Sequence, residues 1–444
     1  MATTATRPAA RTRAQTWRNW AGDQACTPAT VERPRSREQL AEVVRAAADA
    51  GRTVHVAGSG HSFTEAAKSD DVMVQIEALN RVLDSDSDSG LVKVEAGIVL
   101  ADLNEALQQR GLAMENLGDI DRQTIAGAIS TGTHGTGAKL RNISAQVEAM
   151  ELITADGELQ ALTAESSAEE LLAARVSIGA LGAIYSVTLR CVPSFTLHRV
   201  DEPRPLSEVV STFDRLADAN DHFEFFVFPY TEKALTLRRN RSDRSPEPRG
   251  RARAWLSDVL VENTLGDLAS RLGRRFTGLI PRLTRYAAAG ISQGERLDRS
   301  YRIFANERRI RFTEMEYGIP REHGAEAVPR VLDWIRSNRY PVGFPIECRV
   351  VAPDDALLSP SHERETVYIA VHQYRGMEWR PYFEAVEAIM NEYGGRPHWG
   401  KRHFHTHETL AERYPRWADF AAVRDRLDPD RTFRNEYTDR VLGP

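Results

Sequence analysis

The sequence predicts a mixed protein of helices and strands that folds into at least two domains. Its 444 residues exceed what one ordinary hydrophobic core organises. Residues 27–57 alternate strand, helix and strand signals and end in a glycine loop, whereas aromatic-rich strands take over after Pro193. Apolar residues make up 41% of the chain, enough to build sizeable cores. The change near residue 193 is therefore the best candidate for a domain boundary.

Short strands and two helices are expected before Pro193. Residues 38–50 have helical apolar spacing, and Gly51 follows as a helix stop. Asp156-Gly157 is a hairpin signal, and residues 84–90 have the composition of a turn. The predicted strands are 30–34, 54–57, 72–76, 92–96, 147–154, 158–162 and 184–192, and the second helix is 101–110.

Larger strands and helices are expected after Pro193. The Arg-rich, Pro-interrupted residues 238–253 are predicted to form an exposed excursion. The first 15 residues are interpreted as a tail rather than a targeting segment. The predicted strands are 222–228, 309–317, 344–351 and 367–373, and the predicted helices are 325–337 and 381–393.

Composition excludes several classes of protein. The charge sum is 58 − 63 = −5, which gives no overall field for nucleic acid or for an anionic membrane. Three scattered cysteines argue against a disulfide framework and leave nothing on which to build a zinc site, so no metal is expected. No apolar stretch is long enough to form a transmembrane segment. A cytoplasmic enzyme is the expected type.

Two segments are dense in glycine. Residues 56–63 follow a strand, and their backbone N–H groups could approach a pyrophosphate, but taken alone they are better interpreted as a glycine turn with a surface histidine. Residues 124–137 combine glycines with Ser and Thr hydroxyls around buried-type apolar residues. This second composition suits a backbone wrapped against a flat ligand with polar edges, and a flexible loop is the alternative.

Charged residues mark three later positions. Glu347 and Arg349 stand two apart on a predicted strand and therefore point to the same face, either as a structural ion pair or as a charge pair for a polar ligand. His372 and Gln373 end another strand, and Lys401 follows Trp399-Gly400. Taken alone, a histidine on a strand is more often a core residue than a catalyst. A Trp-Gly-Lys run is more often a packed tryptophan followed by a surface lysine.

Taken together and in order, these segments form a specific set: VAGSGHSF, ENLGDIDRQTIAGAISTGTHGTG, ARVSIGALGAIYSVTLRCVP, HFEFFVFPY, RFTEMEYGIPRE, FPIECR and GRPHWGKRH. The chain after residue 15 resembles the aldonolactone oxidoreductases of the vanillyl-alcohol-oxidase flavoprotein superfamily. The resemblance implies an α+β fold. It implies an FAD-binding domain of two subdomains at 1–193, a cap domain with a large antiparallel sheet at 194–396, and a C-terminal segment at 397–444 that returns to the FAD domain.

The resemblance implies that FAD is the cofactor and that it is bound covalently through His61. An imidazole on the flavin 8-methyl group would withdraw electron density and raise the flavin's potential. The cofactor-binding residues implied by motif matching are Val56, Ala57, Gly58, Ser59, Gly60, His61, Ser62, Gly118, Thr124, Gly127, Thr131, Gly132, Thr133, His134, Ile184 and His398.

The implied reaction is oxidation of the hydroxyl beside the carbonyl of an aldono-1,4-lactone, with hydride transfer to flavin N5. Glu347 would position that hydroxyl, and Arg349 would stabilise developing negative charge. His372 and Lys401 would bind sugar hydroxyls, and either could act as the base. Asp119 and Gln373 are the further substrate-binding residues implied.

The acceptor of the electrons is left open. The resemblance makes Gly118 a gate that leaves room for O2, which favours an oxidase, but glycine permits the oxygen reaction without compelling it. A dehydrogenase with an acceptor such as a cytochrome or quinone is the other interpretation. Two further hypotheses are oxidation of a xylitol-like polyol by an alditol oxidase and a flavin-binding protein without turnover.

Overall fold

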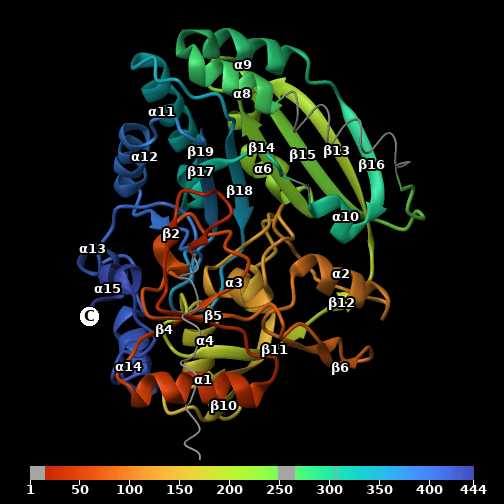
Figure 1. The fold of residues 1–444 in the computed structure, drawn as a ribbon. Coiled ribbons are helices and arrows are strands. Elements are labelled where there is room, and N and C mark those ends of the chain that lie inside the picture. The colour runs from red at the N-terminus through yellow and green to blue at the C-terminus, as the bar shows by residue number, and fades with distance from the viewer. Residues whose placement is uncertain (1–15, 249–265, 306–307) are drawn as a thin grey trace, which may run out of the picture.

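The structure, a computed structural model, describes residues 16–248, 266–305 and 308–444. Figure 1 shows a lower body and, above it, a domain built on one large sheet. Each part has its own hydrophobic core, one with members from Leu40 to Val441 and the other from Leu206 to Met390. The predicted α+β class with a large antiparallel sheet is confirmed. The domain boundaries at 193 and 396 stay predictions.

The lower body contains two main sheets. A parallel sheet has the order β3-β5-β4, and an antiparallel sheet has the order β10-β9-β11-β7-β6. Their strands are β3 (Thr30–Glu32), β4 (Val54–Ala57), β5 (Val72–Gln75), β6 (Val82–Asp86), β7 (Leu91–Glu95), β9 (Val147–Ile153), β10 (Leu159–Thr163) and β11 (Ala183–Arg190). The helices are α1 (Arg37–Asp49), α2 (Leu100–Gln108), α3 (Ile125–Ser130) and α4 (Ala168–Ala174), and the short strands are β1 (Trp17–Arg18), β2 (Ala25–Cys26), β8 (Leu112–Ala113) and β12 (Val192–Pro193).

Helix α1 shows how the local sequence sets an element. The Ser36 side chain accepts a hydrogen bond from the Gln39 backbone N–H and so caps the first turn. Leu40, Val44 and Ala47 then recur at helical spacing and are buried. Gly51, with φ of 64°, adopts the left-handed conformation that ends the helix.

The upper domain is built on an eight-stranded sheet of order β16-β13-β15-β14-β18-β19-β17-β20. Its strands are β13 (Thr196–Pro205), β14 (His222–Val227), β15 (Lys233–Ser242), β16 (Gly294–Arg299), β17 (Phe312–Pro320), β18 (Ile346–Val351), β19 (Thr366–Tyr374) and β20 (Arg396–Pro397). Its helices are α5 (Leu206–Ser211), α6 (Phe213–Asp218), α8 (Gly266–Arg275), α9 (Ile280–Ala289), α10 (Ser300–Phe304), α11 (Gly324–Ser337) and α12 (Arg380–Glu392).

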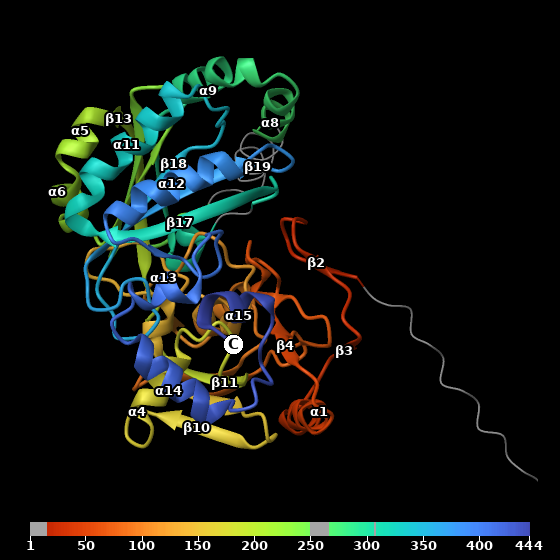
Figure 2. The same cartoon turned by 90° about the vertical axis from the view of Figure 1, so that its left-hand side faces the viewer.

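Strand alternation divides this sheet into an apolar face and a polar face. Phe223 and Phe225, Met315 and Tyr317, and Cys348 and Val350 join one core with residues of α5, α6, α11 and α12, the helices that Figure 2 shows beside the sheet. The residues next to them on each strand point the opposite way because successive side chains of a strand alternate. Those residues are Glu224, Glu314, Glu316, Glu347 and Arg349, all buried. The sheet therefore places a row of buried charges on its second face.

The chain after β20 returns to the lower body through α13 (His407–Ala411), α14 (Trp417–Leu427) and α15 (Glu436–Leu442), which Figure 2 shows there with the C-terminus. The Phe63 N–H donates to the Gly400 carbonyl at 2.8 Å, and the Val54 N–H donates to the Thr432 carbonyl at 2.8 Å. These bonds join β4 and the glycine segment that follows it to the C-terminal segment. Within the described ranges, no helix is both long and apolar enough to cross a bilayer.

Two sequence predictions were wrong in part: residues 87–90 form the predicted turn and residues 243–248 are exposed as predicted, but each predicted segment begins inside a strand. The predicted turn at 84–90 begins inside β6, which pairs with β7 through Asp84–Lys93 and its neighbours. The predicted excursion at 238–253 begins inside β15, where Arg239 is buried and its Nη2 donates to Glu224 Oε1 at 2.6 Å. That ion pair lets an Arg-rich segment form an inner strand. Residues 249–253, and the predicted tail 1–15, lie outside the described residues.

Candidate active site

A glycine-lined cavity lies in the lower body, where β4 ends and α3 begins. Its wall includes ten of the predicted cofactor residues, namely Val56, Gly58, Ser59, Gly60, His61, Ser62, Thr124, Gly127, Thr131 and Ile184. A Cβ atom on Gly58 would lie 2.2 Å from Thr124 Oγ1, and Gly60 has φ of 68°. Only glycine allows the chain to pass this closely at 58 and to turn at 60.

A second cavity lies between the lower body and the polar face of the sheet. We call it the charged cavity. Asp119, Glu316, Arg349, His398 and Lys401 contribute to its wall. The glycine-lined cavity and the charged cavity share His61, Ser62, Gln123 and Thr131, so they are neighbours along one elongated site.

His61 stands where the two cavities meet. Its ring stacks on Trp20, with centroids 5.5 Å apart and planes 23° apart. Burial, and secondarily the positive charges of Arg311 and Lys401, lower the pKa of His61 to about 4. The imidazole is therefore neutral at physiological pH and keeps a nitrogen lone pair.

Arg349 is held by carboxylates on the polar face of the sheet. Its Nη2 donates to Glu347 Oε2 at 2.7 Å, and its Nε donates to Glu224 Oε2 at 2.8 Å. Glu224 and Arg349 are direct partners in the register of β14 with β18. Burial opposes the charge of Arg349, but the nearby carboxylates outweigh burial and raise its pKa further above the usual range. The guanidinium is a fixed positive charge.

Two further residues complete this group of charges: Asp119 from the lower body and Arg308 from the segment before β17. Arg308 donates to Asp119 and, at 3.2 Å, to Glu347 Oε1. Burial raises the pKa of Asp119, but the Arg308 and Arg349 charges outweigh burial and hold it well below the ordinary value. Asp119 is therefore ionised next to two arginines.

Glu314 contacts both Lys401 and His372, the two candidate bases. Lys401 Nζ lies 2.5 Å from Glu314 Oε1, and His372 Nε2 lies 3.4 Å from the same oxygen. Burial lowers the pKa of Lys401 and of His372, but Glu314 outweighs burial and raises the pKa of each above its ordinary value. Both side chains are therefore stabilised in the protonated form, which suits hydrogen-bond donors better than bases.

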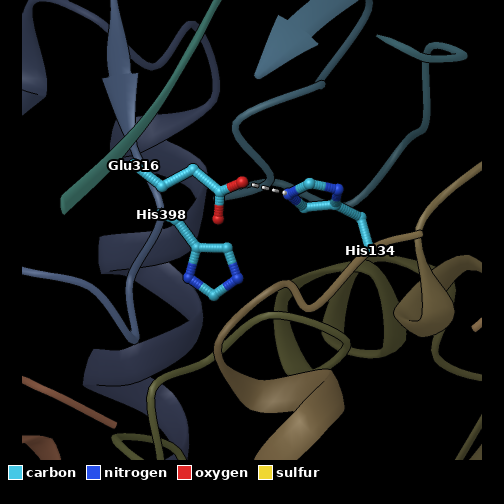
Figure 3. A group of neighbouring side chains, drawn as sticks. All are labelled: His134, Glu316 and His398. Carbon is cyan, nitrogen blue, oxygen red and sulfur yellow. Dashed lines mark ion pairs between the residues drawn. The ribbon is translucent and has the colours of Figure 1, made fainter. Parts of the chain in front are cut away.

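His134, Glu316 and His398 come together on the wall of the charged cavity (Figure 3). His134 Nε2 lies 3.5 Å from Glu316 Oε1, and His134 stacks on Tyr368. The Gly400 N–H donates to His398 Nδ1 at 3.0 Å, and burial lowers the pKa of His398 to about 3. The neutral His398 ring therefore carries its proton on Nε2. His398 presents an N–H to the cavity, and Glu316 is paired with the Lys401 cation. Both features favour hydrogen bonding to a polar ligand over metal binding.

The structure does not bring every predicted residue to the site. Gly118, Thr133, His134 and His398 line the charged cavity, whereas Ala57 packs against Met73, and Gly132 packs near Pro360. Glu347 and His372 do not line the cavity. Glu347 pairs with Arg349, which does, and His372 contacts Glu314, which pairs with Lys401 on the wall.

Gln373 points away from the site, because it is on the opposite face of β19 from His372. Its amide donates to the carbonyls of Pro341 and Glu378. This geometry does not support the predicted contact with substrate.

The residues of the site that sequence reasoning missed include Trp20, Gln123, Glu224, Arg308, Glu314 and Glu316. Glu314 and Glu316 carried a usable signal. They stand two apart in an otherwise apolar strand, the same pattern that identified Glu347 and Arg349. Trp20 and Arg308 lie outside the long strands and carried no comparable signal.

Comparison with known proteins decides the family. Residues 187–441 match the family described as D-arabinono-1,4-lactone oxidase, and residues 28–163 match the family described as FAD binding domain. The chain is 52% identical to the L-gulono-1,4-lactone dehydrogenase of Mycobacterium tuberculosis, over 96% of this chain and 99% of the relative. The chain belongs to the aldonolactone oxidoreductase family.

Other relatives of this family member have related names. The L-gulonolactone oxidase of Bos taurus is 34% identical and the alditol oxidase of a Streptomyces species 31%, each over 96% of this chain and 98% of the relative. Among solved structures, a solvent-stable cholesterol oxidase has a TM-score of 0.80 at 20% identity, over 97% of each chain. That likeness shows that the chain has the same fold as this cholesterol oxidase.

The aldonolactone oxidoreductase site fits FAD. The glycine backbone at 58 and 60 leaves room for a close approach, and Ile184 gives the same cavity an apolar wall. The shared residues join this cavity to the charged one, as a dinucleotide with one reacting end requires. FAD is therefore the cofactor of this oxidoreductase.

Proposed function

We propose that this protein oxidises an aldono-1,4-lactone, such as L-gulono- or D-arabinono-1,4-lactone, at the hydroxyl beside the carbonyl. The observation that carries the proposal is the set of fixed charges on the polar face of the sheet. Arg349 and Lys401 reach the charged cavity, and buried carboxylates hold both. The names of the 52% and 34% identical relatives support the lactone as the substrate class.

When bound, FAD supplies the acceptor for the two electrons that leave the substrate carbon. In this proposal, Arg349 stabilises the negative charge that grows on the hydroxyl oxygen as its proton passes to solvent. Lys401 donates a hydrogen bond to a sugar hydroxyl and so orients the ring. Glu347, His372 and Glu314 do not reach the cavity wall, so we assign them to positioning Arg349 and Lys401.

We further propose that His61 binds FAD covalently. Its neutral ring lies where the cavities meet, and Trp20 holds the ring plane. Gly118, which also lines the charged cavity, is proposed to admit O2, since it presents no side chain there. The same wall would serve a dehydrogenase. The measured rate at which O2 reoxidises the flavin therefore decides between O2 and another acceptor.

A substrate panel tests the proposed function. The purified holoenzyme should reduce dichlorophenolindophenol with L-gulono- or D-arabinono-1,4-lactone and much more slowly with xylitol. Turnover of xylitol alone would replace the proposal by an alditol oxidase, to which the 31% identical relative already points. A yellow protein that turns over none of these compounds would favour flavin binding without catalysis.

A further inference from the structure

The helices α8 and α9 form a hairpin, residues 266–290, that displays large apolar side chains to solvent. Leu268 is 64% exposed, Leu272 41%, Phe276 51% and Tyr286 78%. Among the described residues, only two other large apolar side chains are comparably exposed, Leu83 and Leu159. Isolated exposed leucines are ordinary, but four such side chains on one short hairpin mark an interaction surface.

The same hairpin is strongly basic. It contains five arginines and one aspartate, 5 − 1 = +4, in a chain whose total charge is −5. On α8, Leu268 and Leu272 lie one turn apart, and Phe276 follows directly after the last residue of the helix. Arg275 lies beside Phe276, with its guanidinium 5.3 Å from the centre of the Phe276 ring. Basic and apolar groups therefore share one surface.

A groove behind α8 continues the positive charge. Arg271, Arg274, Arg311 and Arg375 contribute to the wall of this open groove. Asp267 pairs with Arg271, but no carboxylate of the described residues pairs with Arg274, Arg311 or Arg375. Burial and the charge of Arg375 lower the pKa of Arg311. An anion bound here would relieve that repulsion.

The hairpin is fixed to the sheet rather than loosely attached. The Tyr374 hydroxyl donates to Asp267 Oδ1 at 2.8 Å, and Arg274 donates to the Arg375 carbonyl at 3.3 Å. Within α9 itself, Ile280 and Ala288 are buried. Figure 1 shows α8 and α9 at the end of the upper domain away from the lower body. The surface can therefore meet a large, flat partner.

We propose that the α8–α9 hairpin docks the protein on an anionic lipid surface. The four exposed apolar side chains enter the interface, the arginines bind phosphates, and the groove behind α8 takes a lipid headgroup. An acidic protein would satisfy the charge but would not require the exposed apolar side chains. A second copy of the chain would present the same +4 charge and repel it.

This docking goes beyond the proposed lactone oxidation and does not depend on it. Arg311 belongs to the groove and lies 4.5 Å from the centre of the Trp20 ring, which stacks on His61. The groove is therefore linked by direct contacts to the His61 end of the cofactor site.

Vesicle flotation of the full-length holoenzyme tests the proposal. Binding is expected to phosphatidylglycerol-containing vesicles, to weaken with salt, and to be slight on pure phosphatidylcholine. Replacing Arg274, Arg275 and Arg282 by glutamine should weaken binding by about 100-fold, since each basic residue near an anionic surface contributes about fivefold. Replacing Leu272 and Phe276 by serine should also weaken binding at unchanged charge.

The matched controls are Leu159→Ser and Arg110→Gln, which change an exposed leucine and an exposed arginine of the lower body and should bind like wild type. Equal flavin content and equal thermal unfolding would establish that all variants are folded. Equal binding to neutral vesicles, no binding at all, or variants that bind like wild type would overturn the proposal. So would complete competition by inorganic phosphate at matched ionic strength, or a dimer that the Leu272 and Phe276 changes dissociate.

Discussion

Replacing Glu314 by glutamine should disable the active site while the protein stays folded and yellow. Glu314 does not line the charged cavity, but its Oε1 meets Lys401 Nζ at 2.5 Å and His372 Nε2 at 3.4 Å. Glutamine has nearly the same shape and no charge. The substitution therefore removes the electrostatic anchor of Lys401 without opening a cavity.

The size of the effect follows from the remaining partners. Removing one member of a buried ion pair typically costs about 3–5 kcal/mol, because it leaves a buried charge uncompensated. Lys401 keeps Glu316 Oε2 at 3.9 Å, and His372 keeps Glu347 Oε1 at 3.8 Å. The loss should therefore lie near the lower limit. If about 3 kcal/mol falls on the transition state, kcat/KM decreases about 100-fold.

The pH profile separates positioning from a general loss of stability. Glu314 raises the pKa of both Lys401 and His372, so the Gln variant should lose activity at lower pH than wild type on the alkaline limb. Glu295→Gln is the matched control, since Glu295 is an exposed residue of the edge strand β16 and pairs with a histidine, His198 of β13. A Glu314→Gln enzyme with wild-type kcat/KM and an unmoved alkaline limb would refute the reasoning.

Four further outcomes follow. Arg349→Lys cannot keep both the Glu347 and Glu224 hydrogen bonds, so kcat/KM should decrease about 100-fold, and a change under about threefold would contradict the proposed role. His61→Ala should give an acid-precipitated pellet without yellow colour, whereas a colourless wild-type pellet would disprove the covalent bond. Gly118→Ala places a Cβ 3.3 Å from the His134 carbonyl and should slow reoxidation by O2 about tenfold or more while reduction by lactone is retained; equal reoxidation rates would reject the gate. The pKa of Glu224 is lowered to about 2 from 4.5, because the Arg239 and Arg349 charges outweigh burial, so its contribution to stability should be present above pH 4.5 and be lost as the pH falls toward 2; acid unfolding of Glu224→Gln that matches wild type would exclude this origin.

Elements with a strong periodic pattern could be predicted from the sequence. The predicted helices 325–337 and 381–393 correspond to α11 and α12, and the strands 344–351 and 367–373 correspond to β18 and β19, within two residues at each end. The edge strand β16 and its neighbour β13 were not predicted. Their sequences, TLHRVDEPRP and GERLDR, carry charges where an apolar alternation would identify a strand. Pairing with neighbouring strands forms them.

The active site divides in the same way. Glu347 and Arg349 could be predicted because strand alternation is local. Glu224 could not, because it meets Arg349 only through the pairing of β14 with β18, which are more than a hundred residues apart. Glu314 opposes His372 through the pairing of β17 with β19. The chemistry of this site depends on the strand order of one sheet, and no short sequence pattern encodes that order.

The most direct measurement of the central proposal is anaerobic mixing of the holoenzyme with L-gulono-1,4-lactone while flavin absorbance is followed. We predict that the lactone bleaches the flavin in a single turnover, and that Arg349→Lys and Glu314→Gln slow this step, whereas Glu295→Gln does not. Flavin that stays oxidised with every aldono-1,4-lactone tested would contradict the proposed function.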